Sequence, residues 1–191
     1  MPNDDKIYKM LRSKNPDQQT TALYVLIHEG KKTKYLEELF MCANNSDADV
    51  RLPVFMVLGQ VNRKEVIPYL EKALKDEFRK IRMIAALSLA KHRNKKAIPV
   101  LTDMLRKDIR DHSLHKRAIE ALGKYKEQNF IGIFEQMLQH RRVVSRTKAA
   151  EALGKIGTEK AYRVLADAQL KETDAVVRSR IQNVLESFNH S

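Results

Sequence analysis

The feature of this sequence that most constrains its fold is an amphipathic pattern that returns about every 31 to 33 residues. Its fullest copy is Val-Arg-Leu-Pro-Val-Phe-Met-Val-Leu-Gly at 50–59, followed by Val-Ile-Pro-Tyr-Leu at 66–70. The apolar spacing predicts a first helix, A, over about 50–60, a short turn, and a second helix, B, over about 64–75. One such pair cannot bury its apolar faces alone, so neighbouring pairs are expected to stack.

The same pattern occurs along almost the whole chain. With a shift of 31 residues, Arg82 falls on Arg51 and Pro99 falls on Pro68. Later copies of the first helix contain Leu114-His115 with Ala121-Leu122-Gly123, Arg146 with Ala152-Leu153-Gly154, and Val177-Arg178 with Val184-Leu185. A looser pair is predicted at 20–28 and 34–43, after a break at Pro16. We expect one array over 1–191, with a capping helix in 1–15, repeats over 16–188 and a frayed tail at 189–191.

These motifs resemble a known family. The pattern Val-Arg-x-x-Ala-x-x-Ala-Leu-Gly, followed by Ala-Ile-Pro-x-Leu, resembles a HEAT repeat and is similar to the short bacterial type named after phycobilisome lyases. The resemblance covers about residues 16–188 and implies an all-α fold, a right-handed α-α superhelix of about five helix pairs plus flanking helices. It also implies a scaffold or adaptor that binds partners on an extended concave surface, although a fold alone does not determine function.

The net charge of +12 is concentrated in the middle of the chain. Residues 1–50 have a net charge of −1, residues 51–110 of +9, residues 111–148 of +4, and residues 149–191 of zero. A surface with this distribution attracts nucleic acid, acidic proteins or anionic lipid.

The outward positions of the B helices form the candidate partner-binding surface. In HEAT folds these helices line the concave face, and alignment on Pro68 predicts the residues that point outward. They are Lys72, Lys75, Arg106, Lys107, Gln136, Gln139 and His140. Asp103 and Glu135 dilute the positive charge, so an ordinary solvated face is the competing interpretation. We expect an acidic segment of a partner protein to bind here.

A cation recurs at one position of helix A, and we call this set of residues the ladder. Its members are Arg51, Arg82, His115, Arg146 and Arg178. A column of cations can track a phosphate backbone. We favour a structural role instead, in which each ladder arginine pairs with an acidic residue near the preceding turn. The candidate acidic residues are Asp47, Asp49, Asp111 and Asp174.

Two further basic or apolar features have alternative interpretations. The predicted turn at 91–96, Lys-His-Arg-Asn-Lys-Lys, can grip a phosphate or can simply be a solvated loop, and we favour the solvated loop. At the end of the array, Val184 and Leu185 are predicted on the outer face of the last repeat, where another chain can cover them.

The remaining features limit the function classes. No apolar run approaches a membrane span, and the polar N-terminus lacks the apolar core of a signal peptide. Cys42 is the sole cysteine, which fits a reducing compartment, so we expect a cytoplasmic monomer. Isolated histidines without a Cys-x-x-Cys motif argue against a metal site, and no cofactor or enzyme motif is found.

A non-enzymatic protein-interaction scaffold is therefore our main hypothesis. The first alternative is non-specific nucleic-acid binding through the same concave residues. The next is a DNA glycosylase built on HEAT-like repeats, a family that relies on a catalytic aspartate and on tryptophans. This chain has no tryptophan, and Asp103 is the one concave acidic residue expected in its basic middle. A bilin lyase, which the name of the repeat suggests, is ranked last because the sequence has no pigment-site motif.

Overall fold

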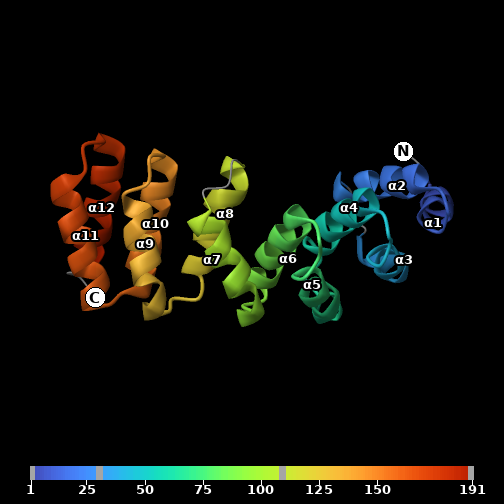
Figure 1. The fold of residues 1–191 in the computed structure, drawn as a ribbon, viewed down its shortest axis with the longest axis horizontal. Helices are drawn as coiled ribbons and strands as arrows, with labels where there is room; N and C mark the ends of the chain where they lie inside the picture. Colours follow the sequence, from blue (N-terminus) through green and yellow to red (C-terminus); the bar gives the residue numbers. More distant parts are fainter. Residues whose placement is uncertain (1–2, 29–31, 108–110, 189–191) are drawn as a thin grey trace. The chain divides into compact units, whose positions relative to one another are not determined.

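A computed structural model describes residues 3–28, 32–107 and 111–188, which form two compact units divided after Ala97 (Figure 1). The described residues fold into α-helices and short 3₁₀ turns, and none of them lies in a β-strand. The first unit contains α1 (Asp4–Leu11), α2 (Pro16–His28), η1 (Lys32–Tyr35), α3 (Leu36–Cys42), α4 (Ala48–Leu58), η2 (Lys64–Val66), α5 (Ile67–Ala73), α6 (Arg79–Lys91) and η3 (Lys95–Ala97). The second contains α7 (Ile98–Arg106), α8 (His112–Gly123), η4 (Gln128–Phe130), α9 (Ile131–Leu138), α10 (Val143–Ile156), α11 (Glu159–Lys171) and α12 (Ala175–Phe188).

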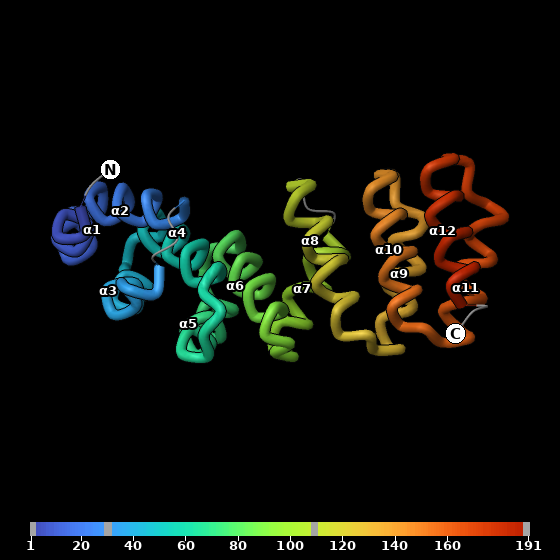
Figure 2. Tube along the Cα trace, turned by 180° about the vertical axis from the view of Figure 1, so that it is seen from behind, coloured from blue at the N-terminus to red at the C-terminus, as the bar shows by residue number. Residues whose placement is uncertain are grey.

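Within each unit, A helices and B helices alternate along the chain (Figure 2). In the first unit α2, α4 and α6 are the A helices, and α4 packs against both α2 and α6. In the second unit α10 packs between α8 and α12 in the same way. The B helices α3 and α5, and α7, α9 and α11 in the second unit, each pack against A helices. A 3₁₀ turn directly precedes several B helices. For example, η2 precedes α5.

The helix boundaries differ from the sequence-based prediction mainly at the start of the chain. The break at Pro16 was expected to delay the next helix until residue 20, but α2 begins at Pro16 itself. Proline suits the first position of a helix, where its missing N–H would have no intrahelical partner. The Asn15 side chain accepts a hydrogen bond from the N–H of Asp17 at 2.8 Å, which satisfies one of the free donors of this helix end. The predicted tail at 189–191 lies outside the described residues.

Small residues allow the A helices to approach one another closely. In the second unit, a Cβ atom added to Gly154 would lie 2.5 Å from Val184 Cγ1, and one added to Gly123 would lie 3.0 Å from Ala152 Cβ. In the first unit, an added Cβ at Gly59 would collide with the hydroxyl of Ser88. The glycine near the end of helix A is therefore a packing requirement in these repeats.

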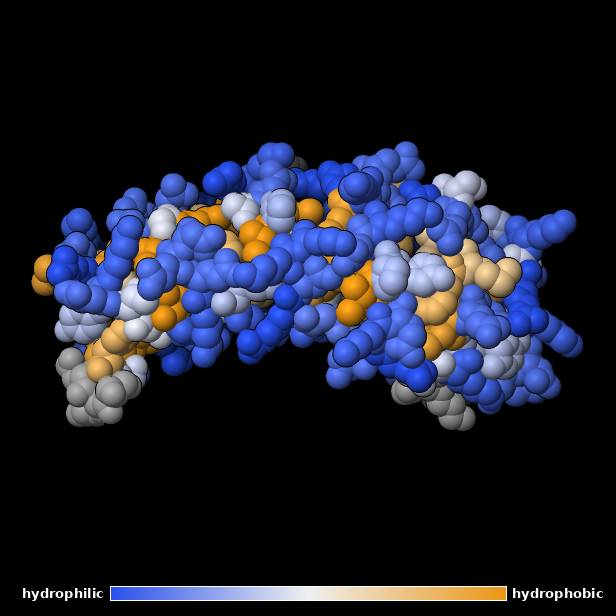
Figure 3. Space-filling view, turned by 90° about the horizontal axis from the view of Figure 1, so that it is seen from below, coloured by the Kyte–Doolittle hydropathy of each residue, from blue (hydrophilic) through white to orange (hydrophobic). Residues whose placement is uncertain are grey.

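The face shown in Figure 3 is mostly hydrophilic, with apolar residues visible in narrow strips.

The last repeat does not present Val184 and Leu185 outward, so that prediction was wrong. Leu185 is only 8% exposed, and Val184 is the residue that Gly154 meets across the α10–α12 contact. Gln182 and Glu186, which are exposed, hydrogen-bond to each other at 2.9 Å. The sequence pattern alone did not reveal which apolar residues of α12 face α10.

The turn after helix A contains a left-handed residue in three repeats. Arg93 and Lys126 both have φ 54°, and Gly157 has φ 66°. Each of them lies four positions after the last buried leucine of its A helix. A residue with a side chain is about 1–2 kcal/mol less stable in this conformation than in the right-handed one, whereas glycine adopts both easily. Arg93 and Lys126 therefore occupy positions that favour glycine.

Candidate partner-binding grooves

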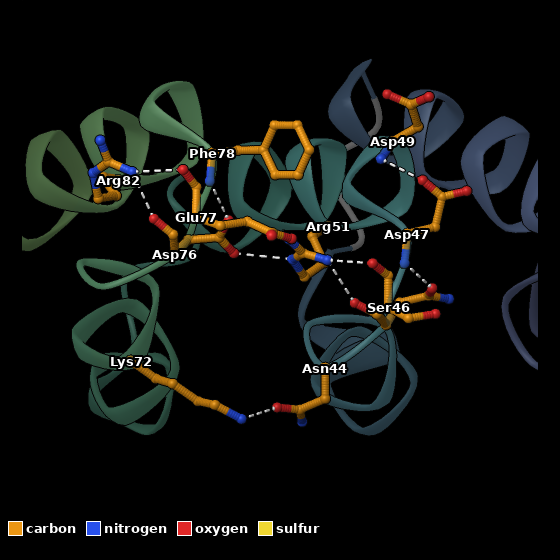
Figure 4. A network of polar contacts seen from close by, with 11 residues as sticks. Asn44, Ser46, Asp47, Asp49, Arg51, Lys72, Asp76, Glu77, Phe78 and Arg82 are labelled. Atoms are coloured by element: carbon orange, nitrogen blue, oxygen red, sulfur yellow. Dashed lines mark hydrogen bonds and ion pairs between the residues drawn. The ribbon is translucent and has the colours of Figure 1, made fainter.

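Arg51 is held in place by five hydrogen bonds (Figure 4). Its Nε and Nη2 atoms donate to the two carboxylate oxygens of Asp76, at 2.9 and 3.2 Å, and Nη2 also donates to Glu77 at 2.9 Å. Its Nη1 donates to the backbone carbonyls of Asn45 and Ser46, at 2.9 and 2.7 Å. The residue is only 8% exposed. Arg51 therefore joins the turn before α4 to the turn before α6.

The other ladder arginines repeat parts of this arrangement. Arg146 pairs with Glu172 at 2.8 and 3.1 Å and donates to the carbonyls of His140 and Arg141. Arg82 donates to the carbonyls of Asp76 and Glu77, and Arg178 donates to those of Glu172 and Thr173. Each of these guanidinium groups binds the backbone of the turn five and six residues before it.

The acidic partners of the ladder differ from those expected. Asp47, Asp111 and Asp174 accept hydrogen bonds from backbone N–H groups at the starts of α4, α8 and α12, so they cap their own helices. The carboxylates that bind Arg51 and Arg146 come instead from the following turn, 25 or 26 residues later. The prediction of a structural role for these two arginines is thus supported, but the preceding turn contributes carbonyls rather than acids.

In the fourth repeat a histidine pair occupies the equivalent sequence positions. His115 stands at the ladder position and is 1% exposed, and His140 follows 25 residues later. The two rings lie 4.8 Å apart, centroid to centroid. His115 Nδ1 lies 3.2 Å from Ser145 Oγ, and His140 Nδ1 accepts a hydrogen bond from the N–H of Arg142 at 3.1 Å. A tilted pair of histidine rings is therefore found where the repeats of Arg51 and Arg146 have an ion pair.

The ion pairs of the ladder shift the acidities of their carboxyl groups. Burial alone acts to raise the pKa of Asp76, but hydrogen bonds from Arg51 and from the N–H of Phe78 lower it more, so this pKa lies below its usual value. Burial likewise opposes the effect of Arg146 and the Asp174 N–H on Glu172, whose pKa is also lowered. Both carboxyl groups are consequently anionic at neutral pH.

The larger of two grooves lies in the first unit, between the successive B helices α3 and α5. It has a volume of about 850 Å³ and is lined by Asn44, Arg51, Tyr69, Lys72 and Lys75, among other residues. Lys72 Nζ donates to the amide oxygen of Asn44 at 2.6 Å, across the groove (Figure 4). Lys75 is exposed in the turn that follows α5. Neither lysine has a carboxylate partner within the described ranges, so both offer a free positive charge.

Tyr69, supported from behind the groove lining by Phe40, contributes an aromatic ring to this groove. The Tyr69 ring stacks on Phe40 with centroids 4.0 Å apart and planes 2° from parallel, so the pair connects α5 to α3. Both rings are half-buried. Lys96, at the groove edge, forms an ion pair with Glu71 at 2.5 Å, and this pairing lowers the pKa of Glu71. The groove thus combines an apolar stack with two lysines that are available for a ligand.

The second unit has a smaller groove, of about 370 Å³, between α9 and α11. Gln139 and His140 line it, together with Arg146 and Glu172 of the ladder. Glu135 and Asp167 also line it, and neither has an ion-pair partner among the residues that the structure describes. This groove is therefore mixed in charge and less basic than the α3–α5 groove.

The seven predicted binding residues fall into three groups. Lys72 and Lys75 line the groove of the first unit, and Gln139 and His140 line that of the second. Arg106 and Lys107 are exposed at and after the end of α7, and Lys107 pairs with Asp103 at 2.8 Å. Gln136 is exposed on α9 but does not line the groove. The sequence-based prediction missed Asn44 and Phe40, because no outward positions were predicted for the looser first helix pair and the turn after it, from which both residues come.

Other candidate chemistry is scarce in the described ranges. Within them, no three His, Cys, Asp or Glu side chains are placed to hold a metal ion, and no helix is long and apolar enough to cross a membrane. Cys42 is buried, and burial raises the pKa of its thiol to about 11. This thiol is therefore protonated and unreactive at neutral pH.

Comparison with solved structures shows the same fold in designed helical-repeat proteins. An engineered protein is 20% identical, with a TM-score of 0.69, and the match covers 100% of this chain and 98% of that one. A designed armadillo repeat protein, solved in complex with the peptide (KR)4, is 18% identical, with a TM-score of 0.66 and coverage of 96% and 98%. A structure of the CpcE–CpcF complex of phycocyanin lyase from Nostoc sp. PCC7120 matches at 14% identity and a TM-score of 0.59, covering 98% of this chain and 95% of that one.

A search of curated proteins gives no match. The family model described as HEAT repeats matches residues 36–113 and 110–186, which together span most of the chain. The matched ranges contain the A helices α4, α6, α8 and α10, most of α12, the ladder and both grooves. On this evidence the chain belongs to the HEAT-repeat family.

Proposed function

We propose that this protein is a non-enzymatic interaction scaffold that binds an acidic segment of a partner protein in the α3–α5 groove. One observation carries the proposal: Lys72 and Lys75 line that groove without a carboxylate partner among the described residues. Other groove cations are already neutralised, Arg51 by Asp76 and Glu77 and Lys96 by Glu71. An acidic segment would therefore meet the two lysines that have a free charge.

The Phe40–Tyr69 stack gives this segment an apolar contact beside the charged one. Binding energy at protein interfaces is concentrated in aromatic and apolar anchors, whereas exposed charges mainly fix orientation and partner choice. Asn44, which Lys72 now contacts, has an amide that can hydrogen-bond an extended backbone once the lysine turns to a ligand carboxylate. We expect the preferred segment to contain acidic residues next to an apolar one.

The remaining predicted binding residues lie in the second unit. Gln139 and His140 supply hydrogen-bonding groups to the α9–α11 groove, and Arg106 is exposed on α7. The peptide-bound designed armadillo protein supports peptide binding as a use of this fold, but its peptide is basic. The preference for acidic segments proposed here rests on the residues of this chain alone.

The absence of catalysis is also part of the proposal. Ser145 and His115 are in hydrogen-bonding distance, an arrangement that serves as a nucleophile and base in many enzymes. Here Ser145 is 2% and His115 1% exposed, so a substrate has no access to either group. The contact is better explained as packing between α8 and α10.

Selection from a library of short random peptides tests the proposal. Peptides bound by the wild-type protein should be enriched in Asp and Glu, and a labelled synthetic copy should lose roughly three- to thirtyfold in affinity for the Lys72→Ala/Lys75→Ala variant. The control variant Lys6→Ala/Lys9→Ala removes two exposed charges from α1 and should bind like the wild type. Selected peptides without acidic residues, or equal losses in both variants, would contradict this function.

A further inference from the structure

We propose a second binding surface, which shares only Lys96 with the grooves, that binds the phosphate backbone of nucleic acid. It is formed in the first unit by residues 59–65, between α4 and α5, and residues 91–96, from the end of α6 into η3, and we call it the turn edge. The Lys91 ammonium donates to the carbonyl of Gly59, which places the two turns against each other. The turn edge contains six basic residues and one acidic residue, a net charge of +5.

Two of these basic residues are uncommitted. Arg63 lies 3.4 Å from Glu65, and Lys96 pairs with Glu71, so both are partly neutralised. The side chains of Lys64 and Arg93 are exposed and make no hydrogen bond or ion pair with any residue that the structure describes. Their charges are available to a ligand without breaking an internal contact.

The backbone at Arg93 gives an independent reason to assign it a function. Arg93 adopts the left-handed conformation, φ 54°, at the position where the second unit has Lys126 in one repeat and Gly157 in the next. Glycine would hold this conformation at lower cost, and within the described residues the Arg93 side chain forms no hydrogen bond or ion pair that would offset the cost. Strained positions of this kind are found where the side chain serves binding. A ligand contact would account for an arginine at this turn.

Nucleic acid fits the turn edge better than an acidic protein does. Protein interfaces normally contain exposed apolar or aromatic anchors. The large exposed apolar residues of the first unit, Tyr24, Met41 and Phe78, all lie outside the turn edge. Phosphate contacts need only cations and hydrogen-bond donors at the surface, which the turn edge has. The proposal goes beyond the scaffold function and, apart from Lys96, uses different residues.

Fluorescence anisotropy with labelled single-stranded RNA and double-stranded DNA tests this surface. The wild type should bind at about 50 mM salt and weaken steeply by about 200 mM. Arg93→Gly should weaken binding by about three- to tenfold at the lower salt and reduce the slope of log K against log salt by about one. Its urea midpoint should be equal to or above that of the wild type, because glycine suits the left-handed turn.

Lys126→Gly is the matched control, because Lys126 has the same φ as Arg93. Its turn in the second unit, residues 123–129, is less basic, since Lys124 is the only other basic residue there. It should keep wild-type binding, whereas Lys64→Gln should weaken binding as Arg93→Gly does. Three results would overturn the proposal: no binding at the lower salt, equal losses for Arg93→Gly and Lys126→Gly, or displacement of the nucleic acid by polyglutamate at equal charge concentration. The last result would assign the turn edge to acidic proteins.

Discussion

Replacing Arg51 with methionine should destabilise the first unit by about 3 kcal/mol. The substitution removes five hydrogen bonds and leaves the Asp76 carboxylate, whose side chain is 9% exposed, with the N–H of Phe78 as a remaining donor. Breaking a buried ion pair from one side costs about 3–5 kcal/mol. Methionine keeps most of the apolar contacts of the arginine stem, so we expect the lower end of that range.

Urea unfolding followed by circular dichroism at pH 7 measures this change. Arg178→Met is the control, because Arg178 is exposed and binds only backbone carbonyls, and its loss should cost about 1 kcal/mol or less. In a double-mutant cycle with Asp76→Asn, the two sites should couple by about 1–3 kcal/mol. Equal effects of Arg51→Met and Arg178→Met, or no coupling to Asp76, would refute the argument that the carboxylate pairing makes Arg51 special.

Two further predictions concern packing and pH. Gly154→Ala should lower stability by about 1 kcal/mol, because the new Cβ meets Val184. Gly132→Ala should raise stability by about 0.5–1 kcal/mol, because nothing lies within 4 Å of the new Cβ and alanine favours a helix. Equal urea midpoints for the two variants would disprove this difference. The lowered pKa values of Asp76 and Glu172 add stability that is complete above their usual values of 3.8 and 4.5 and is lost as pH falls through the lower folded values. Urea midpoints should therefore fall steeply below about pH 4.5, and midpoints that do not change down to about pH 3 would contradict this.

The repeat architecture was predictable because it depends on residue spacing. The 31-residue shift that aligns Pro68 with Pro99 placed the helix pairs correctly, and the same shift recurs from His115 to Arg146. Helix ends were less accurate, since the prediction treated Pro16 as a break whereas the structure uses it to start α2. A proline both disfavours the helical region for the residue before it and suits the first turn of a helix, so the sequence did not distinguish the two.

The partner of each ladder arginine was harder to predict than its role. The chain runs through the rest of helix A and all of helix B before it comes back to the ladder arginine. The turn after helix B therefore lies beside the ladder position of the same pair, about 25 residues earlier in the sequence. The spacings from Arg51 to Asp76 and from Arg146 to Glu172 reflect this return. A search for acidic residues 25 or 26 positions after each arginine would have found both. The aspartates close in sequence were expected to pair instead, but helix capping uses several of them.

The binding residues were difficult to predict for a different reason. The sequence shows where the cations are, but it does not show which of them already form an ion pair. Aligned B-helix positions predicted Lys72 and Lys107 alike, yet Lys107 pairs with Asp103 whereas Lys72 contacts only a neutral amide. Asp103 lies four residues before Lys107, so this pairing was visible as a helical spacing. The contribution of Asn44 depends on how α3 and α5 pack, which no local pattern encodes.

Sorting the cations by what they contact separates stability from binding in this protein. Arg51 is enclosed by carboxylates and carbonyls, so its loss should reduce stability. Lys72 and Arg93 have no carboxylate partner in the described part of the chain, so their loss should reduce binding and leave the fold intact. Arg93→Gly is the sharpest case, because the left-handed turn favours the variant while a phosphate ligand favours the wild type. Opposite changes in stability and affinity at one residue are difficult to explain by packing alone, and they would show that the excess charge of the central repeats serves a ligand.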